Sequence, residues 1–311
     1  MSAGRDDPSS ALLLRATLLI VLSACCFGSI SPLTVIATDR GMALESVQAW
    51  RYTTSAVLLV AFGWWRGRPP RVGVAPWFTP RVLLVAGGGQ ATVATLALIA
   101  LQWIPAATAS FLFYTFPAWV TVITAIRGIE RLDRTRVTAL ALALGGIGFM
   151  VGAPSAASLN PLGVAAVLTG ALVYALYIPV LGTLQRRRDA LDVSRAIAVG
   201  GAVLFVGWAV TTGTLFAIPD RVAFGASALQ GLLSAGSFLA FLAGLRVLGP
   251  VRTAITSTVE PFWTTLLGVL LLRQSVGTGT LIGGVAIMGA VLLLQRRPVA
   301  HRPAQSSASD T

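Results

Sequence analysis

The sequence predicts an all-α integral membrane protein in which ten transmembrane helices form two inverted five-helix repeats. Three observations predict this fold: an apolar composition, ten apolar stretches separated by polar residues, and a repeat that relates the two halves. The 311 residues are 55% hydrophobic and only 11% charged, whereas a soluble domain carries about 25% charged residues. So little charge cannot cover a surface that faces water, and we expect most of the chain to lie in lipid.

The charges indicate topology rather than a nucleic-acid partner. The net charge is +12, and all 23 basic residues are arginine. They fall in short gaps between apolar stretches, whereas a nucleic-acid-binding protein would carry them as a stripe on a polar domain. Cys25 and Cys26 are adjacent and His301 is the single histidine. We therefore expect no disulfide framework, no metal site and no cofactor.

The apolar stretches approach the roughly 20 residues that a spanning helix needs. They cover about 13–37, 45–65, 81–103, 106–126, 136–153, 161–184, 193–217, 223–246, 251–272 and 279–295, between polar tails at 1–11 and 297–311. With an inside N-terminus, the arginines lie mostly at the cytoplasmic ends of these stretches. The exceptions are Arg40, Arg51, Arg221 and Arg273. The positive-inside rule then places both termini in the cytoplasm, and the even number of stretches agrees.

The two halves of the chain share a motif around a proline. TFPAWVT at 115–121 resembles VEPFWTT at 259–265, and the offset of 144 residues pairs Pro117 with Pro261. The search for internal repeats is informative because duplicated units keep such positions.

A second match lies earlier in each half. FGSISP at 27–32 resembles YALYIP at 174–179, and an offset of 147 residues pairs Pro32 with Pro179. We therefore predict one repeat over 12–153 and another over 161–296. Five helices per repeat is an odd number, so the second repeat enters the membrane from the opposite face. Inverted repeats of this kind are typical of secondary transporters.

These features resemble the EamA-type transporters of the drug/metabolite transporter superfamily. The first half closes with IRGIERLDRTRVTALALALGGIGFMVG at 126–152, in which Glu130 and Arg131 take the motif positions. The second half closes with VEPFWTTLLGVLLLRQSVGTGTLIGGVAIMGAVLLL at 259–294, and WRYTTSAVLL at 50–59 resembles the family's second helix.

The second closing turn departs from the family pattern. Arg273 and Gln274 stand where Gly-Glu is usual, which leaves the role of that outer turn open. The resemblance implies a ten-helix carrier of the inner membrane with a central cavity, which exports amino acids, related metabolites or drugs. It implies a small-molecule substrate and a lipid bilayer as partners. Proton coupling or uniport, and a homodimer or a monomer, stay open.

Two other classes of function compete with transport. A membrane receptor or assembly subunit would span the bilayer without carrying a solute, although paired helix interruptions argue against it. A membrane-embedded enzyme would need converging acids, histidines or cysteines, and the apolar stretches offer a single deep carboxylate. We therefore expect no enzyme.

Glu260 is that carboxylate. In a helix over 251–272 it lies nine residues from the start, or about 14 Å at 1.5 Å per residue, near the middle of a hydrocarbon core about 30 Å thick. A charge there costs on the order of 3 kcal/mol. Glu260 therefore either contacts a substrate amine or a coupling proton in a cavity, or pins its helix to a neighbour as a neutral or paired group.

Four prolines are expected to interrupt helices at matching depths of the two halves. They are Pro32, Pro117, Pro179 and Pro261. Proline removes a backbone hydrogen bond, and interruptions at equivalent positions of both halves point to a binding site near the midplane. The alternative is that proline is simply frequent in membrane helices.

Further polar residues are candidates for the transport pathway. Arg51 would bind a substrate carboxylate or pair with Glu260, which together would suit a zwitterion; alternatively it reaches the outer interface as long cationic side chains do. The remaining candidates either line the pathway or join helices by packing. They are Tyr114, Gln90, Trp263 and Tyr177.

Overall fold

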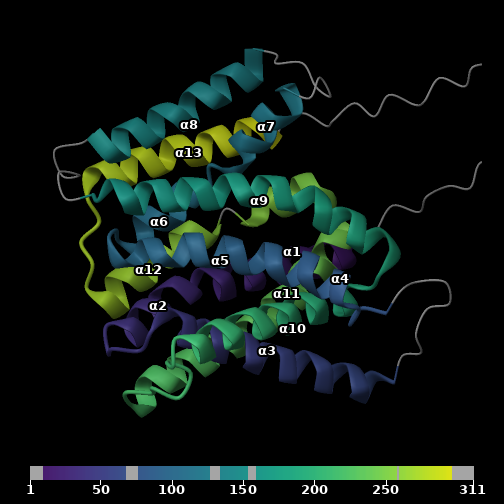
Figure 1. Cartoon of the computed structure of the whole chain (residues 1–311). Helices are drawn as coiled ribbons and strands as arrows, with labels where there is room; N and C mark the ends of the chain where they lie inside the picture. The colour runs from purple at the N-terminus through teal and green to yellow at the C-terminus, as the bar shows by residue number, and fades with distance from the viewer. Residues whose placement is uncertain (1–9, 68–75, 127–133, 153–158, 258, 296–311) are drawn as a thin grey trace, which may run out of the picture.

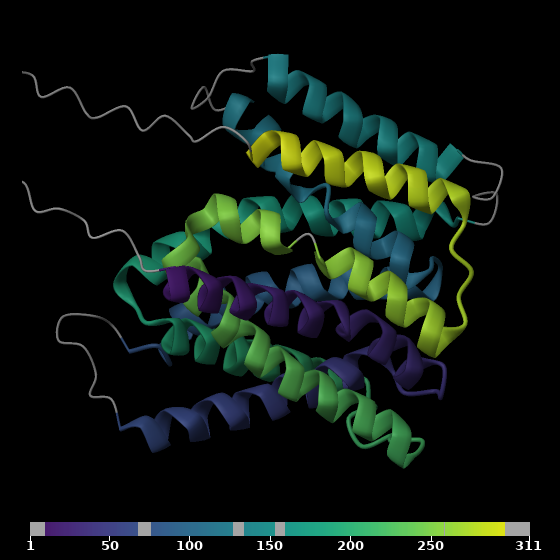
Figure 2. The same cartoon turned by 180° about the vertical axis from the view of Figure 1, so that it is seen from behind.

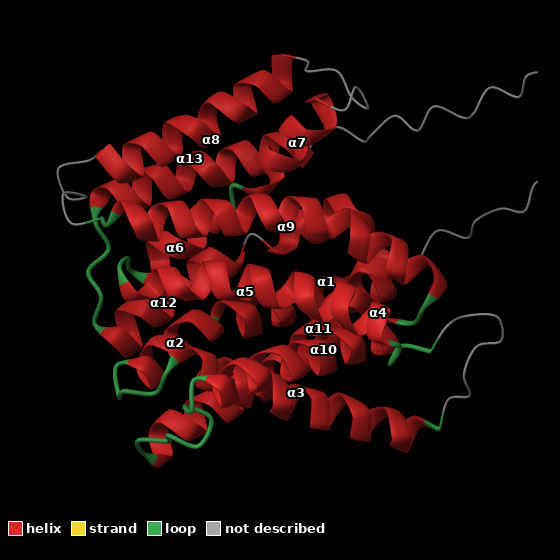
Figure 3. Ribbon diagram, in the orientation of Figure 1, coloured by secondary structure: helices red, strands yellow, loops and turns green. Residues whose placement is uncertain are grey.

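The computed structural model describes residues 10–67, 76–126, 134–152, 159–257 and 259–295, which form helices and turns with no strand among them (Figure 3). Every one of the ten apolar stretches contains helix. The polar tails at 1–9 and 296–311, and Glu130 and Arg131 of the family motif, lie outside the described residues.

The first half contains two interrupted stretches and one that widens into a π-helix. Its elements are α1 (Ser10–Gly28), α2 (Ile30–Thr38), α3 (Leu44–Arg66), α4 (Pro80–Leu83), the π-helix η1 (Leu84–Gly88), α5 (Gly89–Ile99), the 3-10 helix η2 (Ala100–Gln102), α6 (Ala106–Phe113), α7 (Phe116–Ile126) and α8 (Arg134–Gly152). The expected helix at 13–37 is broken at Ser29, and the one at 106–126 is broken at Tyr114 and Thr115.

The second half contains fewer and longer helices. Its elements are α9 (Pro161–Arg187), α10 (Ala190–Thr211), α11 (Arg221–Ser257), α12 (Val259–Leu272) and α13 (Thr278–Gln295). The predicted boundary between 246 and 251 is wrong, because α11 stays helical to Ser257. Backbone groups in lipid need partners inside the chain, which favours a bent helix over an open turn. Figure 2 shows the light green end of α11 turned away from the direction of its first part.

Several of these helices are long and apolar enough to cross a membrane. Five described segments meet both conditions: Ser10–Thr38, Pro80–Gln102, Pro161–Gln185, Ala190–Thr211 and Arg221–Leu248. Three shorter helical segments are also apolar: Val137–Phe149, Val259–Leu272 and Thr278–Leu293. Large apolar side chains such as Leu18, Val203 and Leu270 are exposed on them. An apolar outer surface on helices of this length is that of a multi-pass membrane protein.

The helices pack in pairs that correspond between the halves. In Figure 1, α8 and α13 lie at the top and α3 at the bottom, with α9, α5 and α1 between them. Taken in chain order, α8 packs against its counterpart α13, and α3 against its counterpart α10. The contact of α1 with α11 corresponds to the contact of α9 with α5. The contacts between the two halves are thus related by the repeat.

Two glycine crossings follow the same correspondence. A Cβ atom on Gly87 of η1 would lie 2.4 Å from the Cα of Gly200 in α10, and one on Gly231 of α11 would lie 2.5 Å from the Cβ of Thr54 in α3. Gly87 and Gly231 are 144 residues apart, the offset that relates Pro117 to Pro261. Small residues let membrane helices approach closely, so both crossings depend on the missing side chain.

Helix ends also correspond. α6 ends at Phe113 and α11 ends at Ser257, again 144 residues apart. The helix that follows carries its proline in the first turn, as Pro117 in α7 and Pro261 in α12. Proline suits this position because the first backbone N–H groups of a helix need no partner within it.

The first helices of the two halves differ. Pro32 lies in the first turn of α2, after the break at Ser29. At Pro179 the structure contradicts the expected interruption, because α9 runs from Pro161 to Arg187 without a break. Neighbouring helices can support a proline within a membrane helix.

The turn after α12 contains the two residues that depart from the family pattern, Arg273 and Gln274. Arg273 has φ of 51°, in the left-handed region where glycine is favoured after a helix. The N–H of Gln274 donates to the carbonyl of Gly268 at 3.1 Å, which closes the helix end. Arg273 therefore adopts the conformation that the usual glycine would adopt with less strain.

Candidate functional site

Glu260 is the second residue of α12 and is partly buried. The depth that the sequence predicts for Glu260 assumes a helix that starts at 251, whereas α12 begins at Val259. Measured from the other end, at Leu272, the twelve intervening steps place Glu260 about 18 Å along the helix. The carboxylate thus lies far from the Leu272 end of α12, because Glu260 stands in the first turn of this helix.

Tyr114 contacts the carboxylate of Glu260. The tyrosine lies in the gap between α6 and α7 and is 4% exposed. Its hydroxyl lies 3.0 Å from Oε2 of Glu260 and 2.6 Å from the carbonyl oxygen of Ser257. A hydroxyl has one hydrogen, so it donates to one of these oxygens at a time. The interruption of the helix brings this hydroxyl to the start of α12.

The break between α1 and α2 contacts the same turn of α12. The hydroxyl of Thr264 donates to the carbonyl of Gly28 at 3.0 Å, and Nε1 of Trp263 donates to Oγ of Ser29 at 3.0 Å. A Cβ atom on Gly28 would lie 2.9 Å from the carbonyl oxygen of Glu260, so the close approach requires glycine. Two helix interruptions, between α1 and α2 and between α6 and α7, therefore meet around the first turn of α12 and its carboxylate.

The position equivalent to Glu260 in the first half is apolar. At the offset of 144 residues it is Phe116. The ring centroid of Phe116 lies 5.0 Å from that of Tyr174, 5.7 Å from that of Tyr114 and 6.0 Å from that of Phe113. Aromatic rings at such distances pack edge to face or tilted. The duplicated helix start thus carries a carboxylate in one half only.

Arg51 is buried between α3 and α11, with 2% of its surface exposed. Its Nε donates to Oγ of Ser234 at 2.8 Å and its Nη1 to Oε1 of Gln48 at 3.0 Å. The reading in which Arg51 reaches the outer interface is therefore wrong, because α11 covers it. Among the described residues the structure places no ion pair between Arg51 and Glu260.

The remaining candidates lie elsewhere. The Tyr177 hydroxyl donates to the carbonyl of Ala86, and its ring packs against Gly89, so this side chain joins α9 to the π-helix η1 and α5. Gln90 lies close to the Tyr52 hydroxyl without a hydrogen bond of good geometry. The structure thus brings together Glu260, Tyr114 and Trp263, and separates them from Arg51, Gln90 and Tyr177.

Sequence reasoning missed three contacting residues. Two could have been found from helix spacing, since side chains three or four positions apart share a face. Gln48 precedes Arg51 by three residues, and Thr264 follows Glu260 by four. The contact of Ser29 with Trp263 joins distant segments, which no local spacing indicates.

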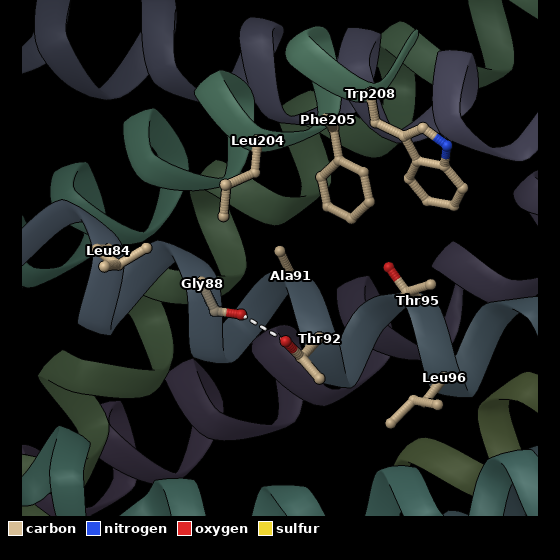
Figure 4. Close-up of a pocket in the computed structure, with 9 residues that line it drawn as sticks. All are labelled: Leu84, Gly88, Ala91, Thr92, Thr95, Leu96, Leu204, Phe205 and Trp208. Atoms are coloured by element: carbon tan, nitrogen blue, oxygen red, sulfur yellow. Dashed lines mark hydrogen bonds between the residues drawn. The ribbon is translucent and has the colours of Figure 1, made fainter. Parts of the chain in front are cut away.

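A cavity of about 630 Å³ lies elsewhere, between α5 and α10. Figure 4 shows the side chains of α10 facing those of η1 and α5 across it, with the Thr92 hydroxyl bonded to the Gly88 carbonyl. Its lining residues are Leu84, Gly88, Ala91, Thr92, Thr95, Leu96, Leu204, Phe205 and Trp208. The lining is mostly apolar and includes neither Glu260 nor Arg51. We place the candidate site at Glu260, because recognition of a polar solute needs polar groups.

Comparison with known proteins places this arrangement in a family. No curated protein matches the chain. A solved structure described only as a crystal structure of protein is 20% identical, covers 94% of this chain and 100% of its own, and superposes with a TM-score of 0.64; this likeness concerns the fold alone. The model of the EamA-like transporter family matches residues 14–152 and 161–296, one match in each half. This chain therefore belongs to the EamA-like transporter family.

Proposed function

We propose that this protein is a secondary or facilitative transporter that exports small metabolites, amino acids or related compounds, by alternating access. The observation that carries the proposal is the meeting of two helix interruptions, one between α1 and α2 and one between α6 and α7, at Glu260 near the start of α12. Broken helices that converge on a polar group near the midplane are where membrane carriers hold their substrates. The family supports the broader class, since its members are membrane transporters of the drug/metabolite superfamily.

The two halves would act as inverted repeats in a ten-helix protein of the inner membrane, with both termini in the cytoplasm. The corresponding helix pairs, the two glycine crossings and the matching ends of α6 and α11 support the repeat. The inversion itself rests on the odd number of helices per half and on the arginine distribution. Such halves exchange roles between the inward-open and outward-open states.

Glu260 would bind either the amine of the solute or a coupling proton. The Tyr114 hydroxyl is suited to respond to that choice. When Glu260 is ionised the hydroxyl donates to it, because a charged acceptor makes the stronger hydrogen bond. When Glu260 is protonated it can donate to the tyrosine oxygen, and the tyrosine hydrogen then turns to the Ser257 carbonyl. The state of the carboxylate is thus passed to the ends of α6 and α11.

The test is solute flux into liposomes that contain the full chain, with candidate amino acids and with or without a pH gradient. We expect Glu260→Gln to abolish flux, because the amide keeps the size of the side chain but loses its charge, while membrane abundance stays unchanged. Glu45→Gln is the matched control: Glu45 lies in the first turn of α3 and accepts hydrogen bonds from Thr212 and Thr214. Undiminished flux in the Glu260 variant would contradict the proposed role of Glu260. Absence of any flux in the unmodified protein would contradict the proposed transport function.

A further inference from the structure

Arg51 is a buried cation without a carboxylate partner among the described residues. Its guanidinium contacts two neutral side chains, Ser234 and Gln48, and lies 4.9 Å from the ring centroid of Tyr52. A buried charge is costly unless it is paired, and intramembrane ionisable residues usually mark a ligand or ion pathway. The arginine therefore requires an explanation that packing alone does not give.

The groups around Arg51 contain more donors than acceptors. Arginine has five N–H groups and accepts no hydrogen bond. The Gln48 amide nitrogen is likewise a donor, and it is buried without a partner. The oxygen of Gln48 already accepts from Nη1 of Arg51, so its amide nitrogen is left as a further donor on the same side chain. What this cluster lacks is an acceptor with a negative charge.

A carboxylate matches this requirement. Its two oxygens accept parallel hydrogen bonds from a guanidinium, and their remaining lone pairs can accept from amide nitrogens such as that of Gln48. A chloride ion would neutralise the charge but would not use the planar fork of arginine. We infer that the cluster of Arg51, Gln48 and Ser234 binds the carboxylate group of the transported solute. This inference rests on the proposed function, because the cluster is closed in this structure and a carrier must open to admit a solute.

The crossing between α11 and α3 is the place where the cluster would open. A Cβ atom on Gly231 would lie 2.6 Å from the backbone oxygen of Arg51, so α11 lies directly over the arginine. Movement of α11 away from α3 would uncover the guanidinium. At the offset of 147 residues Arg51 leads to Ala198, and at the offset of 144 residues it leads to Arg195. Arg195 is paired with Asp192 at 3.4 Å, so the second half carries no arginine at this place that lacks a carboxylate partner in the described structure.

Carboxylate binding is tested on the purified full chain in detergent by thermal unfolding in sodium acetate, glycine, methylammonium chloride and sodium chloride at equal ionic strength. We expect acetate and glycine to raise the melting temperature relative to the two chlorides. Arg51→Gln should remove this shift. Gln48→Leu, which keeps the arginine, should weaken acetate binding at least about tenfold through loss of a hydrogen bond to a charged group. Arg40→Gln, at an exposed arginine paired with Asp220, is the matched control and should keep the full shift.

Equal shifts in acetate and chloride would overturn the inference, as would an acetate shift that survives in both cluster variants. If Arg51→Gln does not fold, Gln48→Leu and Ser234→Ala decide the matter by the same measurement. Flux assays separate the two proposals. Glycine flux with an unchanged KM in Gln48→Leu would overturn the carboxylate site and leave the transporter intact. An acetate shift that depends on Gln48, without flux of any solute, would overturn the transporter and leave the carboxylate site.

Discussion

The start of α12 and the start of α7 are the same place in the two halves, yet they carry different chemistry. Around Glu260, the interruption of α1 supplies Gly28 and Ser29 as polar backbone and side-chain contacts. Around Phe116, the partner helix α9 is continuous and presents the ring of Tyr174. The geometry of a helix that begins near a proline is shared, whereas the polar groups are confined to one half. Duplication thus provides the frame, and divergence within it provides the candidate site.

The largest expected effect is on solute flux and its dependence on pH, which should change for a variant beside Glu260 and not for one at Phe116. Tyr114→Phe removes the hydroxyl that contacts Glu260, and we expect flux to fall roughly tenfold or more, since a hydrogen bond to a charged group is lost. The dependence of flux on pH should also flatten. Phe116→Leu changes the apolar counterpart and should keep the pH profile. Liposome flux across a series of pH values measures both, and an unaltered profile in Tyr114→Phe would remove the hydroxyl from the proposed coupling.

The next effect concerns the close approach at the polar crossing. Gly28→Ala places a Cβ atom 2.9 Å from the Glu260 carbonyl oxygen and the Thr264 hydroxyl, and we expect the free energy of unfolding to fall by about 1–3 kcal/mol. The equivalent position, 147 residues on, is Ala175, which is already buried as alanine. Ala175→Gly should cost only about 1 kcal/mol, through helix propensity. Unfolding measurements on the purified variants give the two losses in free energy of unfolding. Equal losses in the two variants would contradict this prediction.

A smaller effect is expected at the paired tryptophans. Nε1 of Trp263 donates to Ser29, whereas Nε1 of Trp119, its equivalent, is buried without a partner. Trp263→Phe should therefore cost about 1 kcal/mol more than Trp119→Phe beyond the shared loss of ring area, because only the first loses a hydrogen bond. Thermal unfolding of both variants measures the difference, and Ser29→Ala is the control because it removes the acceptor of the same hydrogen bond. Equal losses of stability in the two tryptophan variants would show that this hydrogen bond does not contribute.

The smallest effect lies in the outer loop, away from both regions. Asp220 accepts from the N–H of Ala223 at 2.7 Å and from Arg40 at 2.7 Å. The Ala223 hydrogen bond first, and then Arg40, hold the pKa of Asp220 below its usual value. Its contribution to stability is therefore present above the unfolded pKa of about 3.9 and is lost as pH falls through the lower folded pKa. Asp220→Asn should lower the melting temperature slightly at pH 7, and this loss should shrink as the pH falls below about 3.9.

Hydropathy was sufficient to find the helical stretches, because lipid requires long apolar segments whatever their neighbours are. The prolines of the repeated motif, Pro117 and Pro261, lie in the first turns of α7 and α12, where a proline is compatible with a helix. Hydropathy misplaced the start of α12, because a glycine and a proline at 249 and 250 read as a turn in water but stay within a helix here. Glu260 stood out as a charge in an apolar segment.

The surroundings of the candidate residues were harder to predict. Arg51 lies seven residues into α3, and depth along one helix does not reveal that α11 covers it. The continuity of α9 at Pro179 depends likewise on its neighbours. Contacts such as Trp263 with Ser29 join residues more than two hundred positions apart, so they follow from the packing of whole helices rather than from any local pattern.

The carboxylate that is present at α12 and absent at α7 has an energetic consequence. In an inverted-repeat carrier of the proposed kind, exchange of roles between identical halves would give the inward-open and outward-open states equal free energies. Halves that differ as these do would remove that equality, so the resting carrier would favour one of its two open states. A difference of about 1.4 kcal/mol suffices for a tenfold preference. The asymmetry at Glu260 would thus determine both what the carrier binds and which of its two open states is more populated at rest.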